Sequence, residues 1–184
     1  KKHLMNELFE KKSYPFYKFG DAIYLSKIGT RDWIEYICRR FEVTGKHISE
    51  ELAEKICQKV DNHSSYVQQL AWLVWIHTDK TATDQDFEAA YQDIIDQNTP
   101  LFEKQTESLT TYQMNFLRAV IDGIHSEFTT QEVLHKYQLG SSANVSIVKR
   151  ALVKKELIEI EKRQVLIPDP IMAVWLKREL GMFA

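Results

Sequence analysis

Four consecutive residues, His63, Ser64, Ser65 and Tyr66, form the first group in this chain that could bind a ligand. They lie in a polar break between two apolar segments with helical periodicity, so a helix is predicted to begin there. The first turn of a helix carries unpaired backbone amides and the positive end of the helix dipole, and both attract anions. The pattern therefore predicts a candidate anion site, and an ordinary polar turn is the alternative.

A basic cluster in the C-terminal half is the second such group. Ser142 and Asn144 precede it on the same predicted helix, and lysines and arginines of this kind contact phosphates. Glu156, Glu159 and Glu161 lie within the cluster and would repel phosphates. DNA-backbone contact and a solvated surface are both left open, and we expect the helix to contact a protein ahead of DNA. The cluster consists of Lys149, Arg150, Lys154, Lys155, Lys162 and Arg163.

The sequence contains none of the usual patterns of a catalytic centre or a metal site. It has no Gly-x-x-x-x-Gly-Lys-Ser/Thr loop and no Gly-x-Ser-x-Gly elbow, and no histidine has metal-ligand spacing to another histidine or to a cysteine. Cys38 and Cys57 each lie beside apolar residues in a helical pattern, which predicts buried free thiols rather than a disulfide. We therefore predict no catalytic residue and no metal ligand in this chain.

The composition predicts a folded chain whose two halves differ in charge. At 184 residues and 44% hydrophobic content, the chain suffices for one ordinary domain or two small ones. Residues 1–103 carry 13 lysines and arginines against 17 acidic residues, whereas residues 104–184 carry 11 against 9. This balance argues against nucleic-acid binding by the first half. Because no segment approaches the roughly twenty apolar residues of a membrane span, we expect no membrane contact and a cytoplasmic location.

The segment from Leu109 to Ile167 has the pattern of a winged helix-turn-helix: three helices followed by a hairpin. Thr110 with Gln113, and Thr129 three residues before a glutamate, are predicted capping boxes that begin the first two helices. Gly140 is predicted to end the second helix, because glycine adopts a left-handed backbone without steric strain. The helices are predicted at about 110–125, 129–137 and 142–154, and the strands at 157–161 and 164–167.

Four further helices are predicted before residue 100. The third is apolar around most of its circumference, and its Trp72 and Trp75 are predicted to pack in the core or between domains rather than to stack on bases. Pro100 is predicted to end the fourth helix, and the polar run that follows is the predicted boundary between domains 1–102 and 103–184. The residues predicted to begin these helices are Thr30, Ser49, Ser64 or Ser65, and Thr83.

Several short motifs, in order along nearly the whole chain, resemble the C-terminal part of the archaeal-type P-loop ATPases of the STAND branch of AAA+-like proteins. That part has a helix and a "PFY" linker, a first lid helix, a Gly-x-Pro segment at a later helix start, and a winged helix that ends in "DP…WL". Ser65 stands where the family has the proline. The similar stretches here are His3–Phe9 with Pro15–Gly20, Trp33–Ile37 with Arg40-Phe41, Asn62–Leu70, Leu109-Thr110 with Gln113, and Asp169-Pro170 with Trp175-Leu176.

The resemblance implies a mainly α fold, with a four-to-five-helix AAA+-type lid bundle followed by a winged helix-turn-helix domain that has a small β-hairpin wing. It implies ATP, with Mg, as the cofactor of the parent protein and places His63 to Tyr66 nearest to it. The P-loop and the catalytic acid would belong to an ATPase core upstream of Lys1. The chain by itself is therefore expected neither to hydrolyse ATP nor to bind it tightly.

Two functions follow from these patterns. The leading hypothesis is a regulatory C-terminal fragment of a STAND-type ATPase, whose partners are its own ATPase core and either a protein or DNA at the winged helix. The second is a DNA-binding transcriptional regulator whose helical half senses a signal or forms a dimer. The acidic first half favours the regulatory fragment, as does the predicted helix at Lys2 with no preceding residue to cap it.

Overall fold

The computed structural model describes residues 12–13 and 26–181, and the predictions for the first helix and the aromatic linker near Pro15 lie outside these residues. The described part is mainly helical, with eight helices and one two-stranded antiparallel hairpin. The mainly α class and the hairpin are as predicted, whereas the last helix, α9 (Pro170–Gly181), was not predicted from the sequence. Within residues 26–181, no helix combines the length and the apolar character needed to cross a membrane.

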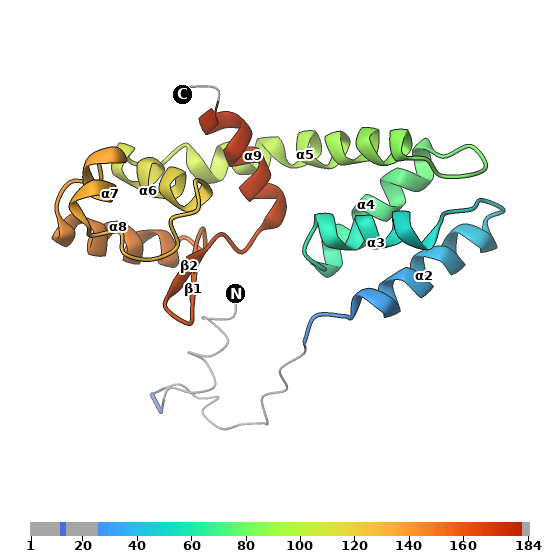
Figure 1. The fold of residues 1–184 in the computed structure, drawn as a ribbon, viewed down its shortest axis with the longest axis horizontal. Helices are drawn as coiled ribbons and strands as arrows, with labels where there is room; N and C mark the ends of the chain where they lie inside the picture. Colours follow the sequence, from blue (N-terminus) through green and yellow to red (C-terminus); the bar gives the residue numbers. More distant parts are fainter. Residues whose placement is uncertain (1–11, 14–25, 182–184) are drawn as a thin grey trace.

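The first three helices of the described part are α2 (Thr30–Val43), α3 (Glu50–Lys59) and α4 (Ser64–His77). They form one end of the molecule, where α2 packs on α3 and α4 packs on the following helix (Figure 1). Ser49 caps α3 as predicted, by accepting a hydrogen bond from the amide of Leu52. Thr30 was predicted to cap α2, but Gly29 occupies the N-cap position, and the Thr30 hydroxyl accepts a hydrogen bond from the Asn62 side chain.

Helix α5 (Asp84–Thr106) spans the molecule, and the prediction that it ends at Pro100 is wrong. Thr83 and Asp86 form a capping box at its start. In Figure 1 the helix runs along the top of the molecule, from α4 at one end to α6 at the other. The predicted domain boundary falls between residues 102 and 103, inside this continuous helix, and the division into two domains stays a prediction.

Burial beyond the proline explains how α5 continues through Pro100, which has no amide hydrogen to donate. Immediately before the proline, the Asn98 side chain donates to the Ile94 carbonyl at 2.7 Å and the Thr99 hydroxyl donates to the Ile95 carbonyl at 3.0 Å. Beyond the proline, Phe102 is fully buried, with its ring centroid 5.6 Å from that of Trp175. Burial of this side chain therefore favours continuation of the helix more than the proline opposes it.

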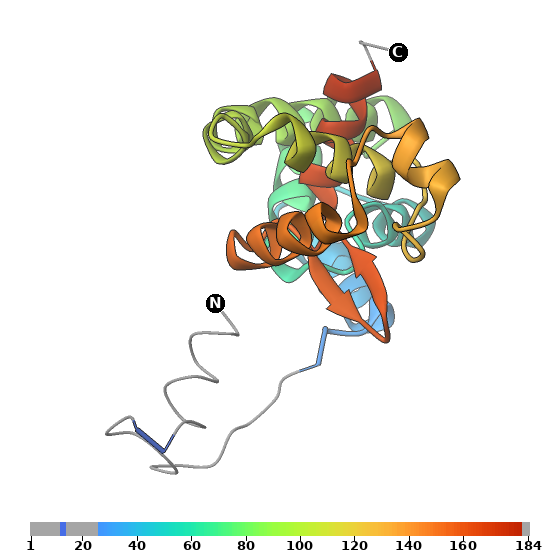
Figure 2. The same cartoon turned by 90° about the vertical axis from the view of Figure 1, so that its left-hand side faces the viewer.

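The C-terminal half is a winged helix, as predicted. Figure 2 shows the hairpin extending beside α8 as the wing. Helix α9 packs on both α5 and α6, and the buried apolar residues of the two halves form one connected cluster. The elements are α6 (Thr111–Ile121), α7 (Gln131–Lys136), α8 (Ser142–Lys154), β1 (Glu159–Glu161), β2 (Gln164–Leu166) and α9 (Pro170–Gly181).

The ends of several winged-helix elements differ from the predictions. Thr130, not Thr129, caps α7, because it is the Thr130 hydroxyl that accepts from the amide of Val133. Helix α7 ends at Lys136, well before Gly140, and Tyr137 is its C-cap. Both Gln138 and Gly140, in the turn that follows, are left-handed, at φ 51° and 77°. The first strand was predicted from residue 157 but begins at residue 159, and residues 157 and 158 are buried before the hairpin. Helix α6 was predicted to extend to about residue 125 but ends at Ile121, before the left-handed residue 123.

We expect Phe102→Ala to lower the free energy of unfolding by about 3–5 kcal/mol, because the substitution leaves a cavity between α5 and α9. Urea unfolding followed by circular dichroism measures this change. The matched control is Leu101→Ala, since Leu101 is the neighbouring residue and is 51% exposed. Equal losses in the two variants would contradict the assignment of Phe102 to a shared core.

Candidate functional site

The turn before α4 places the predicted anion-binding segment at a helix N-terminus, as expected. His63 occupies the N-cap position but makes no side-chain capping bond, so the first amides of α4 have no side-chain partner among the described residues. The turn is held against the start of α2, because Lys27 donates to the carboxylate of Asp61 at 2.6 Å. Asp61 and Asn62 are both left-handed, at φ 50° and 51°, and this reverses the chain between α3 and α4.

His63 and Tyr66 lie together inside this turn, with ring centroids 4.8 Å apart. The Nδ1 atom of His63 is buried and has no hydrogen-bond partner in the described residues. Ser65 is exposed and Ser64 is half-buried. The segment therefore offers the backbone amides at the uncapped start of α4, and such amides favour an anionic group.

Tyr66 forms a hydrogen bond with the C-terminal half of the chain. Its hydroxyl donates to Asp169 Oδ2 at 2.7 Å, while Asp169 Oδ1 accepts from the amides of Ile171 and Met172 at 3.0 and 2.9 Å. Burial, reinforced by the hydrogen bond to Asp169 and its negative charge, raises the pKa of Tyr66 well above its ordinary value. The hydroxyl stays protonated at neutral pH, and its proton is donated to Asp169; the predicted contact of Tyr66 with a ligand stays a prediction.

The predicted contact residues of the winged helix divide between two elements. Arg150, Lys154 and Ser142 are exposed on α8, and Lys149 is half-buried there. Lys162 and Arg163 form the tip of the hairpin, where both are left-handed, at φ 47° and 70°. This backbone matches the right-handed twist of the two strands and holds both basic side chains on the wing.

Asn144 has a structural contact that the sequence did not reveal. Its side-chain amide donates to the Leu139 carbonyl at 2.8 Å and fixes the turn between α7 and α8. The exposed surface of the same helix and the wing also carries two large apolar residues, Ile147 and Ile160. The surface of the winged helix is therefore both basic and apolar, which suits a protein at least as well as DNA.

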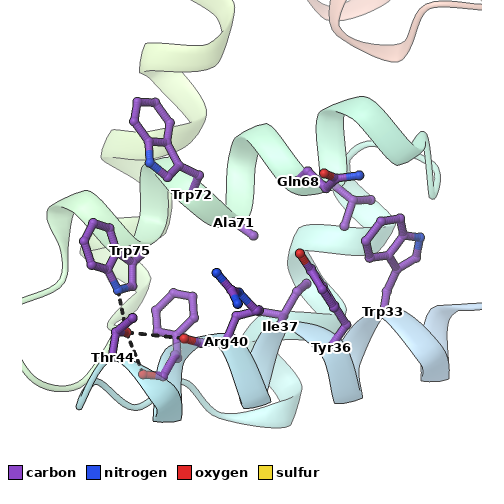
Figure 3. Close-up of a pocket in the computed structure, with 11 residues that line it drawn as sticks. Trp33, Tyr36, Ile37, Arg40, Thr44, Gln68, Ala71, Trp72 and Trp75 are labelled. Carbon is purple, nitrogen blue, oxygen red and sulfur yellow. Dashed lines mark hydrogen bonds between the residues drawn. The ribbon is translucent and has the colours of Figure 1, made fainter.

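A cavity of about 410 Å³ between α2 and α4 is the feature that sequence reasoning missed. Figure 3 shows Tyr36 and Arg40 extending from α2, opposite Ala71, Trp72 and Trp75 on α4. The helical spacing of these residues was visible in the sequence, but nothing in it indicated that the two faces oppose each other. The remaining lining residues are Trp33, Ile37, Phe41, Thr44, Val67 and Gln68.

The prediction that both tryptophans of α4 pack in the interior is wrong for Trp72, whose exposed fraction is 55%. Its neighbour Trp75 is half-buried and held in place: its indole donates to Thr44 Oγ1 at 2.9 Å, and the Lys46 ammonium lies 4.3 Å from the ring centroid. The difference arises because Trp75 has a hydrogen-bond acceptor and a cation beside it, whereas Trp72 stands at the rim of the cavity.

The described residues contain no evident nucleophile or metal centre. Cys57 is buried and Cys38 half-buried, and both are free thiols. Burial raises the pKa of Cys57 to about 11, which leaves very little reactive thiolate at neutral pH. Within residues 26–181, no three histidine, cysteine or acidic residues lie together as metal ligands.

Comparisons with known proteins agree with the observed fold. Residues 100–178 match the family model described as "Probable winged helix domain". The structure is similar to that of a Walker-type ATPase of Pyrococcus abyssi, with a TM-score of 0.71 and 14% sequence identity. The similarity covers 96% of this chain but only 49% of the ATPase chain, so this chain spans about half of its length. No curated protein matches the sequence. The chain thus combines a winged helix with a helical half in an arrangement found in part of a Walker-type ATPase.

Proposed function

We propose that this chain is the lid and winged-helix part of a STAND-type, AAA+-like ATPase, in which the helical half covers ATP bound to a P-loop core. The core would be supplied by a segment outside residues 1–184. The winged helix would then act as an output arm whose position depends on the bound nucleotide. The support for this proposal is the shared fold with about half of a Walker-type ATPase, together with the match to a winged helix domain.

The observation that carries the coupling is the hydrogen bond between Tyr66 and Asp169. Tyr66 lies in the first turn of α4, where His63 and the amides of Ser64 and Ser65 would approach the nucleotide. Asp169 caps α9, which packs against α5 and α6. A shift of the first turn of α4 would therefore act directly on the helix that joins the winged helix to α5.

Bound ATP, with Mg, would supply the phosphate charge that distinguishes one nucleotide state from the other. His63 and the backbone of Ser64 and Ser65 would meet that charge, since an uncapped helix start favours an anion. Tyr66 would transmit the change, because its hydroxyl is already bonded to Asp169. The residues that activate water and hold Mg would come from the core, so the chain by itself should hydrolyse no ATP.

We predict that Tyr66→Phe, in residues 1–184, lowers the free energy of unfolding by about 1.5–3 kcal/mol and speeds amide hydrogen exchange in the first turn of α9. The variant removes a donor to a charged acceptor, and such bonds are typically of this strength. Tyr91→Phe is the matched control, because the buried Tyr91 hydroxyl has no partner in the described residues. Urea unfolding and hydrogen exchange with mass spectrometry measure the two effects, and equal behaviour of the two variants would contradict the coupling role.

The complete protein provides the direct test of the proposed function. The reading frame upstream of the Lys1 codon should encode a Gly-x-x-x-x-Gly-Lys-Ser/Thr motif. In that protein, exchange of ATP for ADP should alter hydrogen exchange in the first turn of α4 and in α9. In Tyr66→Phe the response of α9 should be lost while that of α4 remains. Absence of the motif, or an unchanged α9 response in the variant, would reject the proposal.

A DNA-binding regulator is the second candidate, favoured by the exposed Arg150 and Lys154 on α8. We predict at most weak, sequence-independent DNA binding, because Glu156, Glu159 and Glu161 reduce the positive potential of this surface. Fluorescence anisotropy with random and selected duplexes, at several salt concentrations, measures this binding. A tight, sequence-specific complex at physiological salt, weakened by Arg150→Ala and Lys154→Ala, would favour the regulator instead.

A further inference from the structure

The cavity between α2 and α4 has the size and chemistry of a small-molecule site. Its volume of about 410 Å³ falls in the range of roughly 300–1,000 Å³ that ligand pockets occupy. Its base includes the buried side chains of Ile37, Phe41 and Val67, while Tyr36 and Trp72 at its rim are 48% and 55% exposed. Exposed aromatic faces on opposite helices could hold a flat ring between them.

Ala71 is the reason that the cavity is open on the α4 side. Its methyl group lies between Gln68 and Trp72 along α4 and faces α2 (Figure 3). A larger apolar residue at this position would fill the space that the two helices leave between them. The hollow therefore depends on one small side chain and can be closed by a single substitution.

Arg40 supplies the polar specificity of the cavity. It is the one ionisable side chain, apart from the Tyr36 phenol, among the lining residues. Within residues 26–181, no carboxylate oxygen lies within 4.0 Å of its guanidinium. In Figure 3 the guanidinium extends from α2 toward α4, between Tyr36 and Trp75. Lys46, above the Trp75 ring, adds a second positive charge nearby.

We propose that this cavity binds a small aromatic carboxylate, with its ring between Tyr36 and Trp72 over Ala71 and its carboxylate on Arg40. A guanidinium matches a carboxylate with two parallel hydrogen bonds. A single guanidinium suits one negative charge rather than a chain of phosphates, and none of residues 63–66, the proposed nucleotide contact, lines this cavity. The proposal is also independent of the function proposed above.

The test uses 2-naphthoate as the probe and neutral 2-naphthamide as its matched analogue. Binding is followed in ¹H–¹⁵N NMR spectra through the four indole N–H signals. We expect 2-naphthoate to shift the Trp72 and Trp75 signals saturably and to leave the Trp175 signal in place. The amide should bind about tenfold more weakly, because it lacks the charge-assisted hydrogen bonds.

Three variants and one control complete the experiment. Ala71→Leu should abolish binding of both compounds, and Trp72→Ala should weaken both. Arg40→Met should make the two affinities equal; because Arg40 is exposed, this variant remains informative if Ala71→Leu fails to fold. Ile76→Ala, exposed on α4 outside the cavity, should bind as the unmodified chain does.

Three results would overturn the proposal. The first is an absence of saturable shifts with 2-naphthoate, and the second is equal affinity of the unmodified chain for the acid and the amide. The third is tighter saturation of the same indole signals by ATP than by 2-naphthoate, which would assign the cavity to a nucleotide.

Discussion

The packing of the last turns of α5 against α9 is the contact on which the rest of the structure depends. Phe102 and Trp175 bury their rings against each other across these helices. This burial keeps α5 helical through Pro100 and holds the winged helix against the helical half. If α5 had ended at the proline, the two halves would have been joined only by a linker, and their relative position would not have been set by a shared core.

Two polar contacts supplement this apolar one. Asp169 lies where the chain leaves the hairpin and enters α9, and its carboxylate both caps that helix and accepts from Tyr66 of α4. Arg178, near the end of α9, lies 3.5 Å from the carboxylate of Asp96 on α5. Because that pair is exposed, it adds little to stability, whereas the Tyr66 bond joins a buried side chain to a charged acceptor and contributes more.

In the helical half, the cavity between α2 and α4 is lined by apolar and aromatic residues of the kind usually found in a hydrophobic core. Trp33, Ile37 and Phe41 on α2 are buried, and so are Val67 and Leu70 on α4. Tyr36 and Trp72 belong to the same two helices, yet they are 48% and 55% exposed and line the cavity beside the small residue Ala71. Which aromatic residues are exposed therefore depended on how the two helices pack against each other.

Local sequence patterns determined the type and order of the described elements from α2 to the hairpin, whereas α9 was not predicted. The Thr110–Gln113 and Ser49 caps, the range of α8, the helix start after His63 and the hairpin around Lys162-Arg163 all follow from interactions within a few residues, and all are confirmed. Tertiary structure decided three further features: the continuation of α5 beyond Pro100, the hydrogen bond from the Tyr66 hydroxyl to Asp169, and the exposure of Trp72. Each depends on residues distant in sequence, whose burial or hydrogen bonding outweighs the local preference of the chain.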